Sequence, residues 1–299
     1  MNVNKPQKNN TWLLEISPKS SLFDFKFKEI WRYRDLLMLF VRRDVVTLYK
    51  QTVLGPLWYL IQPLMTSIIF TLVFNGIADI KTGTVNAFLF NLAGITIWNY
   101  FAECLKATSD TFKKNENIFG KVYFPRAIMP LSITISNLLK FSIQACIFVI
   151  FYIYFSFNGE AGTLSWYVLL IPIVVIIMGV LGLGLGMIIS SMVTKYRDLS
   201  FLVQFGVQLL MYISAVMYPI VIVKDKLPSY VSWLVAYNPL ANVIESFRYM
   251  VFTGDYLKNP ADAGFSLLTI AIMFVVAFIV FLIGLVIFNK TERNFIDTV

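Results

Sequence analysis

The chain alternates between polar segments and long apolar segments, six of which are long enough to cross a lipid bilayer. A helix needs about 20 apolar residues to span the hydrocarbon core. The segments cover residues 54–77, 87–110, 129–155, 166–192, 200–222 and 266–288. This pattern predicts an all-α membrane protein whose six transmembrane helices form one domain, residues 53–299.

Residues 28–52, just before the first span, carry apolar side chains at helical spacing, with cations on the other faces. The apolar positions are Ile30, Tyr33, Leu37, Phe40 and Val41. We expect an amphipathic interface helix along the inner leaflet, and position alone leaves open whether it also docks a partner. Residues 1–27 are a polar N-terminal extension in which we expect no cleavable secretory signal.

The segment between the fifth and sixth spans, about residues 223–265, is too long and too apolar to be a simple tether. It contains SYVSWLVAY and LANVIESFRYMVF, separated at Asn238-Pro239, where proline restricts the residue before it. We predict two short helices at the outer surface. They form either an outer gate or an interfacial aromatic belt. The candidate gate residues are Trp233, Tyr237, Asn238, Pro239 and Phe247.

Composition and charge agree with a membrane protein and indicate its orientation. Of the 299 residues, 58% are hydrophobic and 14% are charged, and the net charge is +8. Nineteen of the 25 Lys and Arg residues lie on the side of the N-terminal segment, five lie on the other side, and Lys140 lies within a span. Because basic residues concentrate in cytoplasmic loops, both termini are predicted to lie in the cytoplasm, in the inner membrane of a cell.

Several chemistries are excluded by the residues that the sequence lacks. It contains no histidine, which rules out histidine bases and histidine-liganded metals. It also contains no G-x-x-x-x-G-K-[ST] motif, so any ATP hydrolysis must come from another polypeptide. The run Gly182–Gly186 reads GLGLG, but it lies inside an apolar span without a preceding strand, so we interpret it as a site of close helix packing. We expect no catalytic residue, no metal site and no cofactor on this chain.

Polar residues recur on one edge of several predicted spans. In the second span, Asn99, Glu103, Lys106 and Asp110 follow i, i+4, i+7 and i+11, which places them on one helical face. Such edges either line a passage or form hydrogen bonds between helices. Aromatic rings near these edges can stack on sugars. The candidate channel residues are Trp58, Tyr59, Gln62, Trp98, Asn99, Phe101, Gln208 and Tyr212. Glu103, Lys106 and Lys140 either line the channel or form structural ion pairs.

Four segments resemble one family, the membrane subunits of ABC-2 type exporters of cell-surface polysaccharides such as O-antigen, capsule and teichoic acid. They are LYKQTVLGPLWYLIQPL, NENIFGKVYFPRAIMPL, NPLANVIESFRYMVFTG and the tail ERNFIDTV. Their order around six spans carries the resemblance. The charged Glu103, Lys106 and Lys140 depart from the weakly charged channel of that family, and the extension before Lys26 has no counterpart in it.

The resemblance implies that two copies of the chain assemble with two separate ATPase subunits, which bind ATP and Mg²⁺, and export a lipid-linked polysaccharide. It also implies that the loop between the second and third spans docks on the ATPase, with aromatic rings wedged into a groove and cations at its rim. The coupling candidates are Lys113, Lys114, Asn115, Phe119, Lys121, Tyr123, Phe124, Pro125 and Arg126.

Two other functional classes are compatible with the residues. A gradient-driven transporter or channel would use Glu103, Lys106 and Asp110 as an ion or proton relay, although no inverted repeat is evident. A membrane glycosyl- or acyltransferase would use Glu103 or Asp110 as a base. Transport without a partner ATPase would favour the first class, and turnover of a lipid-linked sugar by the purified chain would favour the second.

Overall fold

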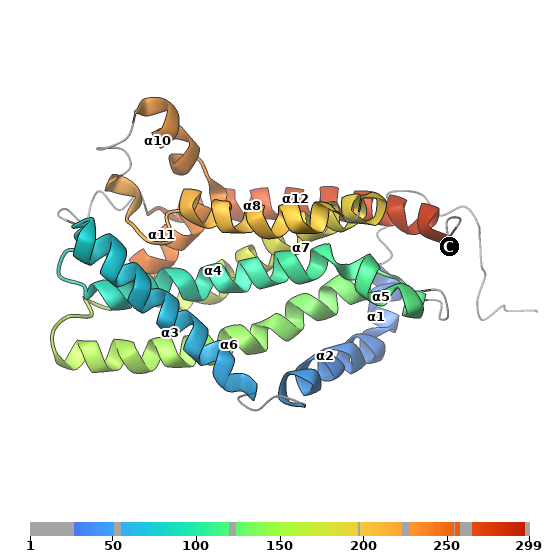
Figure 1. The fold of residues 1–299 in the computed structure, drawn as a ribbon, viewed down its shortest axis with the longest axis horizontal. Helices are drawn as coiled ribbons and strands as arrows, with labels where there is room; N and C mark the ends of the chain where they lie inside the picture. Colours follow the sequence, from blue (N-terminus) through green and yellow to red (C-terminus); the bar gives the residue numbers. More distant parts are fainter. Residues whose placement is uncertain are drawn as a thin grey trace, which may run out of the picture.

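The computed structural model describes residues 27–50, 55–119, 124–196, 198–222, 228–253, 255–257 and 265–296. Every regular element within these ranges is a helix. The main elements are α1 (Phe27–Arg32), α2 (Arg34–Tyr49), α3 (Trp58–Phe70), α4 (Ala87–Ser109), α5 (Thr111–Phe119), α6 (Ile128–Phe157), α7 (Ile171–Lys195), α8 (Leu199–Ile213), α10 (Ser229–Ala236), α11 (Pro239–Phe252) and α12 (Leu267–Ile296). Helices α4, α6, α7, α8 and α12 run along the long axis, and α3 crosses them obliquely (Figure 1).

Four helical stretches among the described residues are long and apolar enough to cross a membrane. They are Trp58–Ile77, Ile128–Phe157, Trp166–Lys195 and Leu267–Thr291. The other two predicted spans differ from these for identifiable reasons. Helix α4 has 23 residues, but Asn91, Asn99 and Glu103 lower its hydropathy, and α8 has only 15 residues before the helix ends at Ile213.

Helix α4 lies at the centre of the bundle, packed between α6 and α7. The predicted close packing at the glycines of α7 is confirmed: a Cβ on Gly182 would lie 2.8 Å from the Cβ of Cys104, and one on Gly186 would lie 2.6 Å from the Cβ of Thr108. Gly184 faces the opposite way and lies against the backbone of Phe281 on α12. Alternate glycines therefore let α7 approach two neighbouring helices at once.

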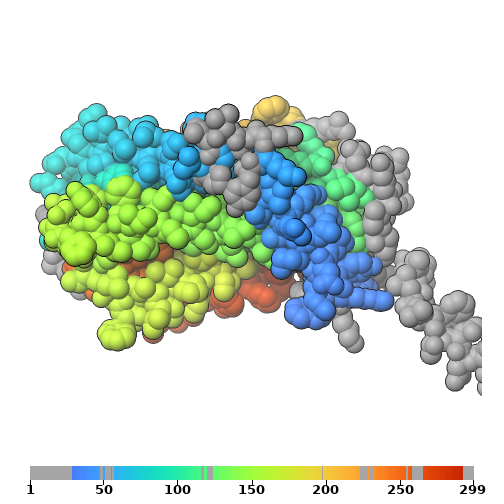
Figure 2. Space-filling view, turned by 90° about the horizontal axis from the view of Figure 1, so that it is seen from below, coloured from blue at the N-terminus to red at the C-terminus, as the bar shows by residue number. Residues whose placement is uncertain are grey.

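The predicted apolar face of the N-terminal helix packs onto the protein. Phe40 and Val41 are buried, and Ile30, Tyr33 and Leu37 pack on the cluster of aromatic rings described below. Helix α2 lies against α6, and Figure 2 shows it in blue at one end of the face that α3 and α6 form. The exposed apolar side chains of this segment are instead Trp31, Met38 and Leu39.

The two short helices predicted between the fifth and sixth spans are present as α10 and α11. Asn238 separates them and caps α11, because its side-chain oxygen accepts a hydrogen bond from the Leu240 amide at 3.0 Å. Pro239 occupies the first position of α11, where its missing N–H costs nothing. Helix α11 packs on α4, α7 and α12, whereas α10 stands away from the bundle (Figure 1).

The glycine contacts yield a prediction about stability. Replacing Gly182 with valine will force α4 and α7 apart, because its side chain meets Cys104 and the carbonyl oxygen of Phe101. Overpacking of this kind costs about 1–3 kcal/mol. We expect a lower midpoint of thermal unfolding for detergent-purified Gly182→Val than for the wild type.

Gly206 provides the matched control, since it lies on α8 and a Cβ there would meet nothing within 4 Å. Gly206→Ala should leave the midpoint unchanged or raise it slightly, because alanine favours helix more than glycine does. Equal midpoints for the two variants would show that α4 and α7 are not in close contact.

Candidate functional site

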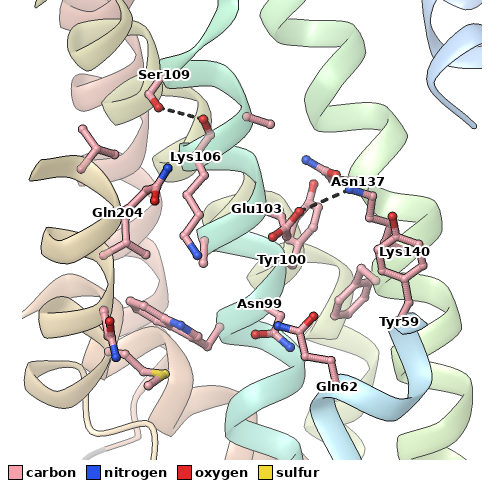
Figure 3. Close-up of a pocket in the computed structure, with 18 of the residues that line it drawn as sticks. Tyr59, Gln62, Asn99, Tyr100, Glu103, Lys106, Ser109, Asn137, Lys140 and Gln204 are labelled. Carbon is pink, nitrogen blue, oxygen red and sulfur yellow. Dashed lines mark hydrogen bonds and ion pairs between the residues drawn. The ribbon is translucent and has the colours of Figure 1, made fainter. Parts of the chain in front are cut away.

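A polar groove of about 610 Å³ runs between α3, α4, α6 and α8. Its wall on α4 contains the predicted polar stripe, and side chains from α3 and α6 face it on one side while α8 faces it on the other (Figure 3). The polar lining residues include Tyr59, Gln62, Thr66, Asn99, Glu103, Lys106, Asp110, Asn137, Lys140, Gln144, Gln204 and Gln208. The helical spacing of the stripe therefore produces one continuous polar surface.

An ion pair joins α4 to α6 inside the groove. The Nζ of Lys140 lies 3.3 Å from Oε2 of Glu103, and the side chains are 18% and 46% exposed. The same ammonium lies 5.2 Å from the centre of the Tyr59 ring on α3. Deeper in the groove, Asn99 donates to Oε1 of Gln144 at 3.5 Å. Because both residues line the groove and nearly half of the Glu103 side chain is exposed, this pair both joins two helices and lines the cavity.

Lys106 points from α4 toward α8 and Gln204 (Figure 3). Its ammonium forms no ion pair with any carboxylate in the described part of the chain, whereas Lys114 pairs with Asp110 at 3.2 Å. Lys106 is exposed, and its backbone oxygen accepts a hydrogen bond from Ser109 at 2.7 Å. The groove therefore contains one cation with a free donor group and several side-chain amides.

The lining is suited to a ligand that is rich in hydroxyl groups. Amides such as Gln62, Gln204 and Gln208 can each donate and accept hydrogen bonds, and the ring of Tyr59 can stack on an apolar face of a sugar, whereas Trp98 touches the groove but is only 3% exposed. In the described residues, no three side chains of the acidic or cysteine type come together in a way that could hold a metal ion. The arrangement favours passage or binding of a polar ligand.

Five of the eight candidate channel residues lie on this groove: Tyr59, Gln62, Trp98, Asn99 and Gln208. The other three do not line it. Phe101 is fully buried, because two residues beyond Asn99 a helical side chain points toward the core. Trp58 and Tyr212 are 56% and 43% exposed outside it. The pattern did not single out the apolar lining residues Phe141 and Met211, because ordinary apolar positions carry no distinguishing signal.

The candidate coupling residues divide into a buried set and an exposed set. Phe119, Phe124, Asn115 and Arg126 are buried, and Pro125 is half-buried. Lys113 and Lys114 are exposed on α5, and Lys121 and Tyr123 lie outside the described residues. The rings of Phe119 and Phe124 are therefore not free to enter a groove on another protein.

These two rings belong to an aromatic cluster that we define as Phe40, Phe112, Phe119, Phe124 and Phe288. Phe112 of α5 stacks on Phe288 of α12 with ring centres 4.5 Å apart, and Phe40 of α2 lies 5.7 Å from Phe124. The guanidinium of Arg126 lies 5.1 Å from the Phe119 ring. The aromatic cluster thus fastens α5 to both α2 and α12.

The candidate gate residues also divide into an exposed pair and a set that packs within the protein. Trp233 and Tyr237 of α10 are 59% and 73% exposed, with ring centres 5.9 Å apart. Asn238 donates to Oγ of Ser214 at 3.1 Å, and Pro239 begins α11. Phe247 is buried, and its ring lies 6.2 Å from that of Phe148 on α6. Among the five candidate gate residues, Trp233 and Tyr237 are therefore the two whose side chains are mostly exposed.

Comparison with known proteins agrees with this architecture. Residues 35–252 match the family model described as ABC-2 type transporter. Two O-antigen export system permease proteins RfbA from Klebsiella pneumoniae are each 29% identical over 263 residues, which cover 88% of this chain and 94% of the relative. The O-antigen export system permease protein RfbA from Myxococcus xanthus is 25% identical over 225 residues, covering 75% and 83%.

The groove geometry predicts which positions react with water-soluble thiol reagents. In a Cys146→Ser background, which removes the exposed native cysteine, Gln62→Cys and Gln208→Cys should be modified because both side chains are exposed and line the groove. Phe101→Cys is the control and should stay unmodified, since that position is 0% exposed. Equal labelling of all three by a maleimide in native membranes would contradict the groove.

Proposed function

The chain belongs to the ABC-2 type transporter family, and on that premise we propose that it is the membrane permease of an ATP-driven exporter of cell-surface polysaccharide. The carrying observation is the likeness to three O-antigen export permeases along most of the chain. The groove supports the proposal because its amides, hydroxyls and rings match a polyhydroxylated cargo.

The cargo in this proposal is a lipid-linked glycan, such as an O-antigen, that crosses the cytoplasmic membrane. A polar chain cannot cross hydrocarbon unaided, whereas a groove lined by Gln62, Asn99 and Gln208 replaces its water hydrogen bonds. The carrier lipid remains outside in the bilayer. The ring of Tyr59 would contact sugar faces without recognising one particular order of sugars, which suits a repetitive polymer.

The proposed topology has six spans, with α4 and α8 added to the four most apolar stretches. Helix α4 tolerates its polar residues because they face the groove and α6 instead of lipid. In this proposal both termini lie in the cytoplasm, which the excess of Lys and Arg on the N-terminal side supports. Helices α10 and α11 then lie on the outer face, where Trp233 and Tyr237 would form the gate.

We further propose that the transporting unit contains two copies of this chain, with the groove closed by the second copy. Helix α8 supports this because most of its surface is uncovered: Phe201, Leu202 and Phe205 are 75%, 65% and 61% exposed. One side of α8 is aromatic and apolar, while another side borders the polar groove. Neither lipid alone nor water alone would suit both sides. A second copy would cover it and complete the passage.

Energy in this proposal comes from two separate ATPase subunits, which bind ATP and Mg²⁺. The exposed Lys113 and Lys114 of α5 would meet an acidic rim on the ATPase. The buried Phe119 and Phe124 would have a different role from the one predicted from sequence. Through the aromatic cluster they would carry a displacement of α5 to α2 and α12.

The coupling proposal predicts the effect of reversing charge on α5. The double variant Lys113→Glu, Lys114→Glu should lose most of the ATPase that copurifies with the tagged chain in mild detergent, because like charges would then face each other. The measurement is the molar ratio of ATPase to permease, together with ATP turnover.

The matched control is Lys195→Glu, Lys290→Glu, which makes the same change in net charge at exposed positions at the ends of α7 and α12. It should retain the ATPase. If no ATPase copurifies even with the wild type, the exporter loses its energy source, and a gradient-driven transporter becomes the better account.

A further inference from the structure

Arg248 is the largest fully buried side chain in the described structure, with 0% exposure. It lies on α11, in a segment whose basic residues the sequence pattern assigned to the outer surface. A buried arginine must be paired and hydrogen-bonded, because an uncompensated buried charge strongly destabilises a fold. Its partners therefore show what the residue holds in place.

The guanidinium of Arg248 binds the backbone that follows α8. Its Nη1 donates to the carbonyl oxygens of Ala215 at 2.8 Å and Tyr218 at 3.3 Å, and its Nη2 donates to that of Val216. These carbonyls belong to the turn that follows α8, which ends at Ile213, and buried carbonyls need hydrogen-bond donors. Arg248 thus supplies the donors that this turn needs and fixes the chain just beyond α8.

The surroundings of Arg248 fix its position. The guanidinium stacks on the Phe90 ring of α4 at 3.8 Å, and Nη1 lies 3.6 Å from Oε2 of Glu245. Tyr256 donates to the other oxygen of Glu245 at 3.1 Å. Gly94 of α4 leaves the necessary space, since a Cβ there would clash with the guanidinium and with the carbonyl oxygen of Val216. One side chain therefore connects α4, α11 and the end of α8.

The rest of α8 is held weakly by this chain. Val207 is the one residue of Leu199–Ile213 that is buried, and Phe201, near the start of the helix, is 75% exposed. In contrast, Ser214, Ala215, Val216 and Met217 are all at most 1% exposed. A second contact strengthens the same end, because Asn238 donates to Oγ of Ser214. The helix is fastened at one end and loosely packed along its length.

We propose that Arg248 is a positioning residue that acts as the pivot of α8. The end at Ala215–Tyr218 stays fixed to α4 and α11, while the Leu199 end swings toward or away from α4 and changes the width of the groove. The proposal rests on the proposed function only in treating the groove as the passage. The position of α8 can be measured without any ATPase or cargo.

The test measures the distance across the groove directly in the full chain in lipid nanodiscs. Spin labels at Ala107→Cys and Gln204→Cys, in a Cys146→Ser background, report the separation of α4 and α8, since both positions line the groove. Labels at Ala107→Cys and Ile150→Cys on α4 and α6 serve as the control pair, because Ile150 is 64% exposed on a helix that packs directly on α4.

In Arg248→Met we expect the α4–α8 distance distribution to broaden and move to longer distances, with the α4–α6 pair unchanged. Arg248→Lys should lie between the wild type and Arg248→Met, because an ammonium keeps the charge but cannot satisfy three carbonyls in a planar fork. If Arg248 has a purely structural role, its replacement will lower the thermal midpoint but leave the α4–α8 and α4–α6 distance distributions of the folded protein unchanged. That result would overturn the proposal.

A second variant decides the matter if Arg248→Met does not fold. Gly94→Ala keeps the arginine and displaces its guanidinium from the carbonyl of Val216. The proposal expects the same broadening for the α4–α8 pair. A wild-type distribution in folded Gly94→Ala overturns it. These distances can be measured even if no ATPase copurifies with the chain. Failure of the pivot proposal can therefore be distinguished from failure of the proposed exporter function.

Discussion

The close approach of α4 and α7 is the constraint on which the site depends. Because Gly182 and Gly186 let α7 lie directly against one face of α4, that face is buried in the helix contact. The opposite face is then free to carry Asn99, Glu103 and Lys106. A larger residue at either glycine would rotate or displace α4, and the polar stripe would no longer face α3, α6 and α8.

The ion pair between Glu103 and Lys140 shows how the bundle accommodates charge in this setting. Its two residues come from α4 and α6, which pack together, and the Glu103 side chain lines the groove and stays partly exposed. A charge without a partner in hydrocarbon costs several kcal/mol, so charged residues there face partners or cavities. Glu103 and Lys140 face both a partner and the groove. They can therefore be a structural ion pair and line the groove at the same time.

Much of the architecture follows from patterns along the chain, and the exceptions have physical causes. The four long apolar stretches, the stripe on α4, the glycine packing and the break at Asn238-Pro239 all depend on local spacing. The fixed turn after α8 does not, because it is held by Arg248 and Asn238, which are distant from it in sequence. Burial of Phe119 and Phe124 was equally unpredictable, since an aromatic ring beside cations has the same local sequence whether it packs inward or outward. Arg248 could have been detected from Glu245 at i−3, an ion-pair spacing in an apolar helix.

The most direct test of the account is transport in proteoliposomes. The purified chain, reconstituted with and without the proposed ATPase, is supplied with a fluorescent lipid-linked O-antigen glycan on the side to which the ATPase is added. The account predicts that the glycan appears on the opposite side only when the ATPase and hydrolysable ATP are both present. Equal movement of the glycan by the chain alone, or no movement with the ATPase and ATP, would contradict it.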